Sequence, residues 1–354
     1  MRKVSLDKIQ AGIRVARTIH TLDGLVLLTA GTKINEEIVN KLKNHGITEI
    51  YAEDRLSFGI EVPELVKEEI LTDVKTQVKQ LLTMPSVKIS VDGKKITELV
   101  DTLINNILKE DLILAALSDI RSIDDYTFSH SVNVCILSII TGSALGLKGE
   151  SLKDLATGAL LHDIGKMSVS YEILQKPSSL LKNEFIEVKK HTEYGYEVIK
   201  NSRNLPPSVA LIALCHHERM DGSGYPHQLK GNDIPFSARI VAVADVFDAL
   251  TSDRVYRQKM MPHEVVDYMC SLSQRHFDKN VLDAFIRHVA YYPVGTAVVL
   301  NSGEKGLIAR NNSDFPARPV VRIVMDDQGK MLAQHQEVDL ARHLEYRILD
   351  IWDI

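Results

Sequence analysis

The sequence predicts a mainly α-helical protein, with a long helical block between a small α+β module at the N-terminus and a small β-rich module at the C-terminus. Helical spacing of apolar residues runs from Ile96 almost without interruption to about Ala290. Short apolar runs separated by turn signals fill residues 3–56 and return after residue 293. At 354 residues the chain exceeds one ordinary core of ~150 residues, so two or three modules are expected.

The first 60 residues are expected to form the α+β accessory domain. The Asp23-Gly24 pair separates two strand-like stretches, as a tight turn between paired strands does. Thr32 or Asn35 is a candidate cap for a helix that ends before Gly46. Nothing in this segment names a ligand or an input signal.

Three further segments are predicted: a connector and two domains. Residues 61–118 are a helical connector, because apolar residues from Pro63 to about Leu82 recur at intervals of three and four. Such a stripe packs on its own chain more often than on a partner, although it is compatible with a homodimer. Residues 119–290 are the all-α block. Residues 291–354 are the β-rich domain, with strands expected at 296–300 and 320–325.

Composition narrows the classes of partner and the location. A net charge of −5 and a pI near 6.2 provide no basic field for polymeric nucleic acid or for an anionic membrane. No run approaches the ~18 apolar residues of a membrane span, and the N-terminus lacks the apolar core of a signal peptide. The three cysteines lack C-x-x-C spacing, which argues against a disulfide framework or a thiolate zinc site. A cytoplasmic protein is therefore expected.

Five of the thirteen histidines lie within a stretch of 88 residues of the helical block: His130, His162, His191, His216 and His217. A solitary helical histidine is more often a core or surface residue than a ligand, but a group reverses that preference. His162 and Asp163 interrupt the apolar helical sequence LLHDIGK at positions that should be buried. Burying such groups without a partner costs about 1–3 kcal/mol each, so the fold must supply one. A metal ion is one such partner.

A second group follows in the sequence HHERMDGSGYP. Adjacent helical residues diverge by ~100°, so His216 and His217 converge on one site only where a helix ends or points into it. Gly222 and Gly224 supply that ending, and Pro226 stiffens the exit. The alternative is an ordinary Gly/Pro-rich surface loop.

A third feature is Asp245, which lies inside the apolar sequence ARIVAVADVFDAL, where no N-cap role explains it. The combined set contains imidazoles and carboxylates without thiolate, which suits iron, manganese or zinc in a catalytic site. The seven candidates are too many for one tetrahedral site and suit two ions. Paired ions activate water and stabilise displacement at phosphorus, so phosphoester hydrolysis is the natural reaction.

The sequence HDIGK at 162–166, together with HHERMDGSGYP at 216–226, resembles the signature of the HD-GYP family, a subclass of the HD metal-dependent phosphohydrolases. The two motifs together are highly specific, whereas an isolated His-Asp pair is not. The resemblance covers about residues 120–290 and includes YTFSHS at 126–131, KHTEYG at 190–195 and DRVYR at 253–257. It implies an all-α HD-type helical bundle core flanked by accessory modules.

The resemblance also implies residue roles. The implied metal ligands are His130, His162, Asp163, His191, His216, His217 and Asp245. Asp163 would bridge two divalent ions, iron or manganese first, with zinc, magnesium, nickel and cobalt as alternatives. Family members with a third metal carry a glutamate where this chain has Tyr126, so two ions are expected.

The same resemblance assigns the substrate contacts. Asp163 and Lys166 would be catalytic, and Lys166, Arg254 and Arg257 would hold substrate phosphates. The loop Gly224-Tyr225-Pro226 would line the substrate cleft. For the two arginines, a surface ion pair is the alternative.

The expected function is a bacterial phosphodiesterase of second-messenger signalling. A metal-bridging hydroxide would hydrolyse cyclic di-GMP to linear pGpG, with slow further hydrolysis to GMP. Two alternatives stay open. One is a receptor that binds cyclic di-GMP without cutting it, against which the intact ligand set argues. The other is a hydrolase of another nucleotide, such as cyclic GMP-AMP, because base recognition rests on contacts that the sequence does not reveal.

Overall fold

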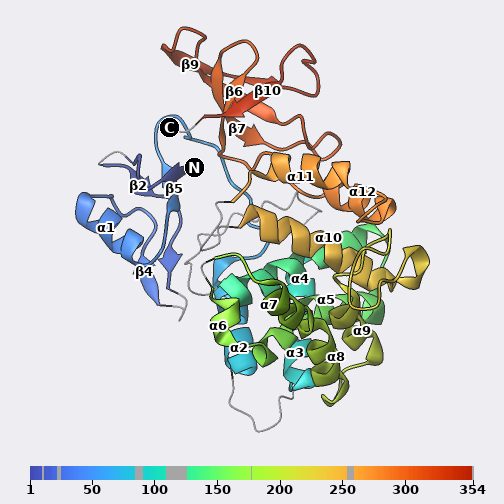
Figure 1. Cartoon of the computed structure of the whole chain (residues 1–354). Coiled ribbons are helices and arrows are strands. Elements are labelled where there is room, and N and C mark those ends of the chain that lie inside the picture. Colours follow the sequence, from blue (N-terminus) through green and yellow to red (C-terminus); the bar gives the residue numbers. More distant parts are fainter. Residues whose placement is uncertain are drawn as a thin grey trace. The chain divides into compact units, whose positions relative to one another are not determined.

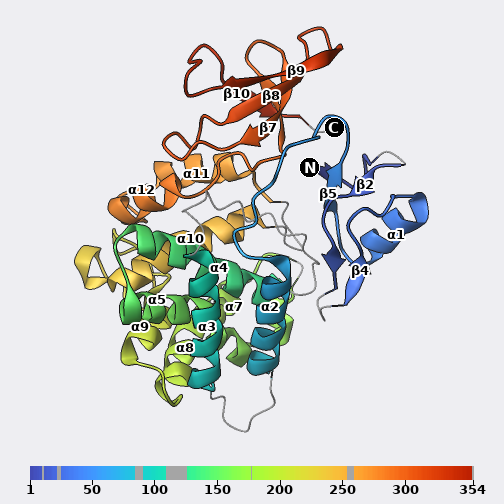
Figure 2. The same ribbon diagram turned by 180° about the vertical axis from the view of Figure 1, so that it is seen from behind.

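The computed structural model describes residues 1–9, 12–21, 25–83, 91–108, 126–176, 178–252 and 259–352. These fall into two compact units, one with the described residues of 1–72 and 287–352, the other with those of 73–108 and 126–286. Figures 1 and 2 show the chain from opposite sides. The mainly helical fold class is confirmed. The domain boundaries at residues 60, 118 and 290 stay predictions.

The N-terminal part of the first unit is a small α+β fold. Its antiparallel three-stranded sheet has the order β1 (Arg2–Ser5), β5 (Glu49–Glu53), β2 (Arg14–Val15). A separate antiparallel pair consists of β3 (Ile19–His20) and β4 (Val26–Leu28). The predicted turn at Asp23-Gly24 lies outside the described residues.

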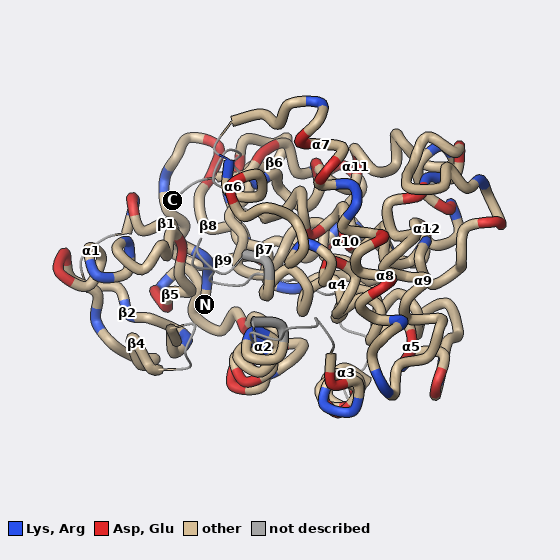
Figure 3. The backbone as a smooth tube through the Cα atoms, turned by 60° about the horizontal axis from the view of Figure 1, so that its bottom comes forward, with Lys and Arg blue, Asp and Glu red and all other residues tan. Residues whose placement is uncertain are grey.

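Helix α1 (Glu36–Asn44) begins at one of the two predicted caps. The side-chain oxygen of Asn35 accepts a hydrogen bond from the Ile38 amide at 2.8 Å, which satisfies one free N–H of the first turn. Acidic residues open the helix and basic residues close it, as the red and blue segments of α1 in Figure 3 show. This order complements the helix dipole.

The C-terminal part of the first unit is a five-stranded antiparallel sheet. Its strand order is β10-β6-β7-β8-β9, formed by β6 (Ala297–Leu300), β7 (Lys305–Arg310), β8 (Val320–Met325), β9 (Met331–Asp339) and β10 (Ile348–Ile351). The two strands predicted from the sequence are confirmed as β6 and β8. Tyr51, Ile60 and Val62 join the buried apolar residues of this sheet in one core. The first and last segments of the chain therefore share a core.

The second unit is helical. Its elements are α3 (Gly93–Ile107), α4 (Tyr126–Ala144), α5 (Gly149–Leu161), the 3₁₀ helix η2 (Ile164–Ser168), α6 (Tyr171–Leu174), α7 (Lys182–Lys189), α8 (His191–Lys200), α9 (Pro207–Cys215), the 3₁₀ helix η3 (Gly231–Asp233), α10 (Phe236–Thr251), α11 (Pro262–Ser271) and α12 (Lys279–Arg287). Helix α4 packs against α5 and α10, and α9 packs against α5 and α8. Helix α3 lies along α4 and α5, which is clearest in Figure 2.

The predicted connector helix is α2 (Glu68–Thr83), which starts five residues later than Pro63. Val62 is buried in the core of the C-terminal sheet, and residues 62–67 between it and α2 form no helix. Val74 and Val78 on the predicted stripe are fully buried. Among the helices that the structure describes, none combines the length and the apolar character needed to cross a membrane.

Candidate metal centre

The seven candidate ligands come together inside the helical unit. His130 lies on α4, His162 and Asp163 form the turn between α5 and η2, His191 opens α8, His216 and His217 follow the end of α9, and Asp245 lies within α10. All are buried except His217, which is half-buried. They form two groups, and within each group the ligand atoms lie within 4.8 Å of one another. The first group is Asp163, His191, His216 and His217, and the second is His130, His162 and Asp245.

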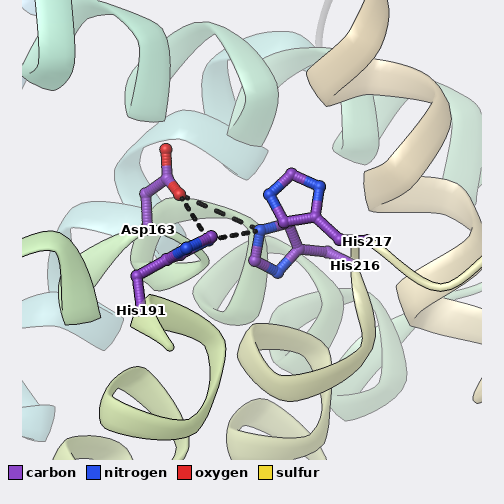
Figure 4. A group of neighbouring side chains, drawn as sticks. All are labelled: Asp163, His191, His216 and His217. Carbon is purple, nitrogen blue, oxygen red and sulfur yellow. Dashed lines mark hydrogen bonds and ion pairs between the residues drawn. The ribbon is translucent and has the colours of Figure 1, made fainter. Parts of the chain in front are cut away.

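Asp163 is a member of the first group and also faces the second. Its Oδ1 is 3.3 Å from Nε2 of His191 and 3.8 Å from Nε2 of His216, the contacts drawn in Figure 4. Its Oδ2 is 3.3 Å from Nε2 of His162 and 3.7 Å from Nε2 of His130. Each oxygen of one carboxylate thus faces a different group, which is the arrangement a bridging ligand requires.

Asp245 provides the second carboxylate of the centre. Its Oδ1 is 3.1 Å from Nε2 of His130 and 4.0 Å from Nε2 of His162, and its Oδ2 is 3.8 Å from Nδ1 of His217. Asp245 therefore also contacts residues of both groups. These contacts with the histidines explain why a carboxylate interrupts the apolar sequence of α10.

Three histidines are oriented by main-chain carbonyls. Nδ1 of His162 lies 2.7 Å from the Ala159 oxygen, Nδ1 of His191 lies 2.6 Å from the Val188 oxygen, and Nδ1 of His216 lies 2.9 Å from the Ala213 oxygen. Because a carbonyl only accepts, Nδ1 must carry the proton. Nε2 of each neutral ring then offers its lone pair to the centre, which is the form that binds a metal.

Two buried polar atoms indicate that the cluster fits a metal ion. Nε2 of His162 and Oδ1 of Asp163 have no hydrogen-bond partner among the described residues. Leaving such atoms unpaired costs about 1–3 kcal/mol each, so an ion in this position would remove a penalty that the fold otherwise carries. The His/Asp cluster is therefore suited to divalent metal.

The electrostatics favour the ligand forms of His191, His216 and Asp163. Burial lowers the pKa of His216 well below its usual value and lowers that of His191, so both rings are neutral. Burial alone would raise the pKa of Asp163, but the Lys166 ammonium beside it holds that pKa well below the usual range. Metal ligands must be neutral imidazoles and ionised carboxylates.

His130 differs because a carboxylate orients it. Its Nδ1 lies 2.7 Å from Oδ2 of Asp248, whose Oδ1 accepts a hydrogen bond from Asn133 at 2.9 Å. Burial opposes protonation, but hydrogen bonds to Asp245 and Asp248 raise the pKa of His130 to about 9. Asp248 was not among the residues predicted from the sequence. The available signal was its spacing of three residues after Asp245, which places both carboxylates on one face of α10.

Asp248→Asn is expected to weaken Mn(II) binding about 10–100-fold, the usual cost of removing a group that orients a metal-binding histidine. Titration calorimetry on metal-stripped protein measures the change. The matched control is Asp283→Asn, because Asp283 forms an exposed ion pair with Lys279 on α12. An unchanged affinity in Asp248→Asn would exclude the orienting role.

The turn that carries His162 and Asp163 fits against α8 because residue 165 is glycine. A Cβ on Gly165 would lie 1.9 Å from the His191 carbonyl oxygen and 2.4 Å from the Gly195 amide nitrogen. The glycine of HDIGK therefore allows η2 to approach the start of α8. This approach brings Asp163 within reach of His191.

The second glycine motif folds back on the histidine pair. A Cβ on Gly224 would lie 2.5 Å from main-chain atoms of residues 217–219, and the Tyr225 amide donates to the His217 carbonyl at 3.2 Å. The Tyr225 ring centroid is 4.8 Å from that of His217. The buried Glu218 carboxylate accepts hydrogen bonds from the main-chain amides of residues 227 and 229. The loop is thus packed beside the centre, unlike an ordinary surface loop.

The predicted phosphate-binding residues are only partly described. The Lys166 ammonium forms an ion pair with Oδ2 of Asp163, and about a third of the side chain is exposed. Pro226 follows Tyr225 in the packed loop. Arg254 and Arg257 lie outside the described residues.

Residues 123–281 match a family model described as an HD domain, and residues 297–354 match one described as a KOW domain associated with HD domain. The fold and the histidine–aspartate centre thus define an HD-domain protein. With both signature motifs present, residues 123–281 form an HD domain of the HD-GYP type.

Three relatives show what the chain resembles. It is 36% identical over 253 residues to a cyclic di-GMP phosphodiesterase of Pseudomonas aeruginosa, covering 72% of this chain and 61% of the relative. It is 44% identical over 149 residues to a cyclic di-GMP phosphodiesterase response regulator of Xanthomonas campestris, covering 42% and 39%. It is 36% identical over 163 residues to a 3′3′-cGAMP-specific phosphodiesterase of Vibrio cholerae, covering 46% and 31%. The chain therefore spans less than two thirds of each relative.

Proposed function

We propose that the protein is a metal-dependent phosphodiesterase that hydrolyses cyclic di-GMP to linear pGpG. The observation that carries the proposal is the Asp163 carboxylate, whose two oxygens face two separate groups of ligand atoms. Two of the relatives are named as phosphodiesterases of this dinucleotide, which supports the substrate. The relative specific for 3′3′-cGAMP makes that dinucleotide the second candidate.

Seven residues would hold two divalent ions: His130, His162, Asp163, His191, His216, His217 and Asp245. Their imidazole and carboxylate donors favour iron or manganese. When bound, such a pair supplies a water of lowered pKa and neutralises charge that develops on the phosphoryl oxygens. The chain's own contribution is to fix these donors through the main-chain contacts of the histidines and to keep the two carboxylates ionised.

Lys166 would act on the substrate beside the ions. Its ammonium already lies against Oδ2 of Asp163, so it is within reach of a phosphate bound at the centre. There it would stabilise the developing negative charge or protonate the leaving 3′-oxygen. Tyr225 and its neighbours Gly224 and Pro226 would line the substrate cleft, and Arg254 and Arg257 would hold phosphates. A bacterial cytoplasmic location and a homodimer stay predictions.

The test is metal removal and reconstitution. The protein is purified anaerobically, stripped with a chelator and reloaded separately with Fe(II) and Mn(II), and cyclic di-GMP and 3′3′-cGAMP are followed by chromatography. The expected result is pGpG that appears only in the reloaded protein, with GMP formed more slowly. Cleavage of 3′3′-cGAMP alone would favour the second candidate. Two bound ions with uncut but bound cyclic di-GMP would favour the receptor instead.

A further inference from the structure

A row of aromatic and cationic side chains leads outward from the metal centre. It begins at the Tyr225 ring, which lies 4.8 Å from the His217 ring and 6.5 Å from the His191 ring. The Lys189 ammonium lies 5.0 Å from the centroid of the Tyr225 ring and 4.8 Å from that of the Phe185 ring. Phe185 and Lys189 are four residues apart on α7 and therefore share one face of this helix.

The Lys189 ammonium makes cation–π contacts with two aromatic rings. Among the described residues it forms no ion pair, whereas the next residue, Lys190, pairs with Glu187 at 2.8 Å. Phe185, at the outer end of the row, is 48% exposed. A cation that has no carboxylate partner in the described part of the chain and an exposed aromatic residue thus lie beside a centre that would hold the substrate's phosphate.

We propose that Phe185 and Lys189 form a subsite for one purine base of the dinucleotide, an assignment that rests on the proposed function. A substrate held by its phosphate must place its bases outside the centre, because imidazoles and carboxylates fill the centre itself. The base stacks on Phe185, as bases do on aromatic side chains of many nucleic-acid-binding proteins. Lys189 donates to O6 and N7 of guanine, both acceptors, whereas adenine presents an amino group in place of O6.

The two residues therefore make different contributions to specificity. Stacking on Phe185 depends little on the identity of the base. The hydrogen bonds from Lys189 depend strongly on it, because adenine offers one acceptor where guanine offers two. Lys189 would thus decide between cyclic di-GMP and dinucleotides that contain adenine.

The test compares Lys189→Met with Lys190→Met in the metal-reconstituted full chain. The substrates are cyclic di-GMP, cyclic di-AMP and bis(4-nitrophenyl) phosphate, which is a phosphodiester without a purine. Lys189→Met is expected to raise KM for cyclic di-GMP about tenfold, within the discrimination that such a base contact provides. The value of kcat for cyclic di-GMP, the turnover of bis(4-nitrophenyl) phosphate and the bound metal should not change. Lys190→Met should match the wild type throughout.

Phe185→Ala gives a second, independent signature. It should raise KM for cyclic di-GMP and cyclic di-AMP by similar factors, since stacking is tolerant of the base. Ile186→Ala is its control, because Ile186 is an exposed neighbour, 59% against 48% for Phe185, that lies outside the row. Equal effects of Phe185→Ala and Ile186→Ala would overturn the subsite, because they would indicate a general apolar surface of α7.

Failure of the subsite and failure of the proposed function give different results. If the wild type cuts cyclic di-GMP and Lys189→Met leaves the ratio of KM for cyclic di-AMP to KM for cyclic di-GMP unchanged, the subsite is wrong and the function stands. Loss of kcat and metal together in Lys189→Met would also overturn the subsite. If the wild type binds cyclic di-GMP without cutting it, a tenfold weaker affinity of Lys189→Met in calorimetry supports the subsite alone.

Discussion

Asp163→Ala is expected to lose both the bound metal and the hydrolysis of cyclic di-GMP. Asp163 is the one described carboxylate with one oxygen facing His191 and His216 and the other facing His162 and His130. Its removal takes away one of the two carboxylates of the centre, the one whose oxygens face both groups, and leaves only Asp245. Metal ions contribute several kcal/mol to such reactions, and each 1.36 kcal/mol is a factor of ten, so turnover should fall about 1000-fold or more.

Two further variants separate charge from folding. Asp163→Asn keeps the shape of the side chain but not its charge, and it should lose the metal as Asp163→Ala does. Asp154→Ala on α5 is the matched control, because Asp154 accepts a hydrogen bond from Ser208 away from the seven candidate ligands. Metal content, pGpG formation and circular dichroism are measured together. An Asp163→Ala protein with two ions and full turnover would rule out the bridging assignment.

Three of the seven candidate ligands break a local rule of the sequence, and the others were assigned through the group of histidines and the resemblance to the HD-GYP family. His162 and Asp163 interrupt an apolar helical pattern, and Asp245 does the same in α10. Burying these groups is unfavourable without a partner, so a single sequence already indicates a shared site. Their distribution between two groups could not be predicted, because it depends on how the ends of α5 and α9 meet the start of α8.

The residues that support the ligands are less visible in the sequence. Asp248 lies one turn after Asp245, but only the packing of α4 on α10 shows that it orients His130. Lys189 is likewise indistinguishable in the sequence from other surface lysines, and only the structure shows that its ammonium lies beside the Tyr225 ring. These contacts join residues that are distant in sequence, and helical periodicity contains no information about such contacts.

The fold shows the same division between local and distant information. The helical block and the strands β6 and β8 have clear apolar patterns and were predicted. Strand β9 was not, because most of its residues are exposed and polar and it lacks an apolar alternation. The core shared by Tyr51 and the C-terminal sheet joins the two ends of the chain, so no local pattern could indicate it.

Gly165→Ala is expected to disturb the centre without changing any ligand. The new methyl group would lie 1.9 Å from the His191 carbonyl oxygen, which is main chain and cannot rotate away. Helix α8 or η2 must therefore move, at a cost of about 1–3 kcal/mol in the free energy of unfolding. Because a displacement of ~1 Å can cost about 100-fold in rate, turnover and metal affinity should fall by about that factor.

Gly195→Ala is the matched control, because this glycine faces Gly165 across the same contact. A Cβ on Gly195 would have its nearest neighbours at 3.4 Å or more, which is ordinary contact, and alanine favours a helix by about 1 kcal/mol over glycine. Gly195→Ala should therefore keep its metal and melt at or above the wild-type temperature. If Gly165→Ala behaved in the same way, the close approach of η2 to α8 would not be what holds Asp163 near His191.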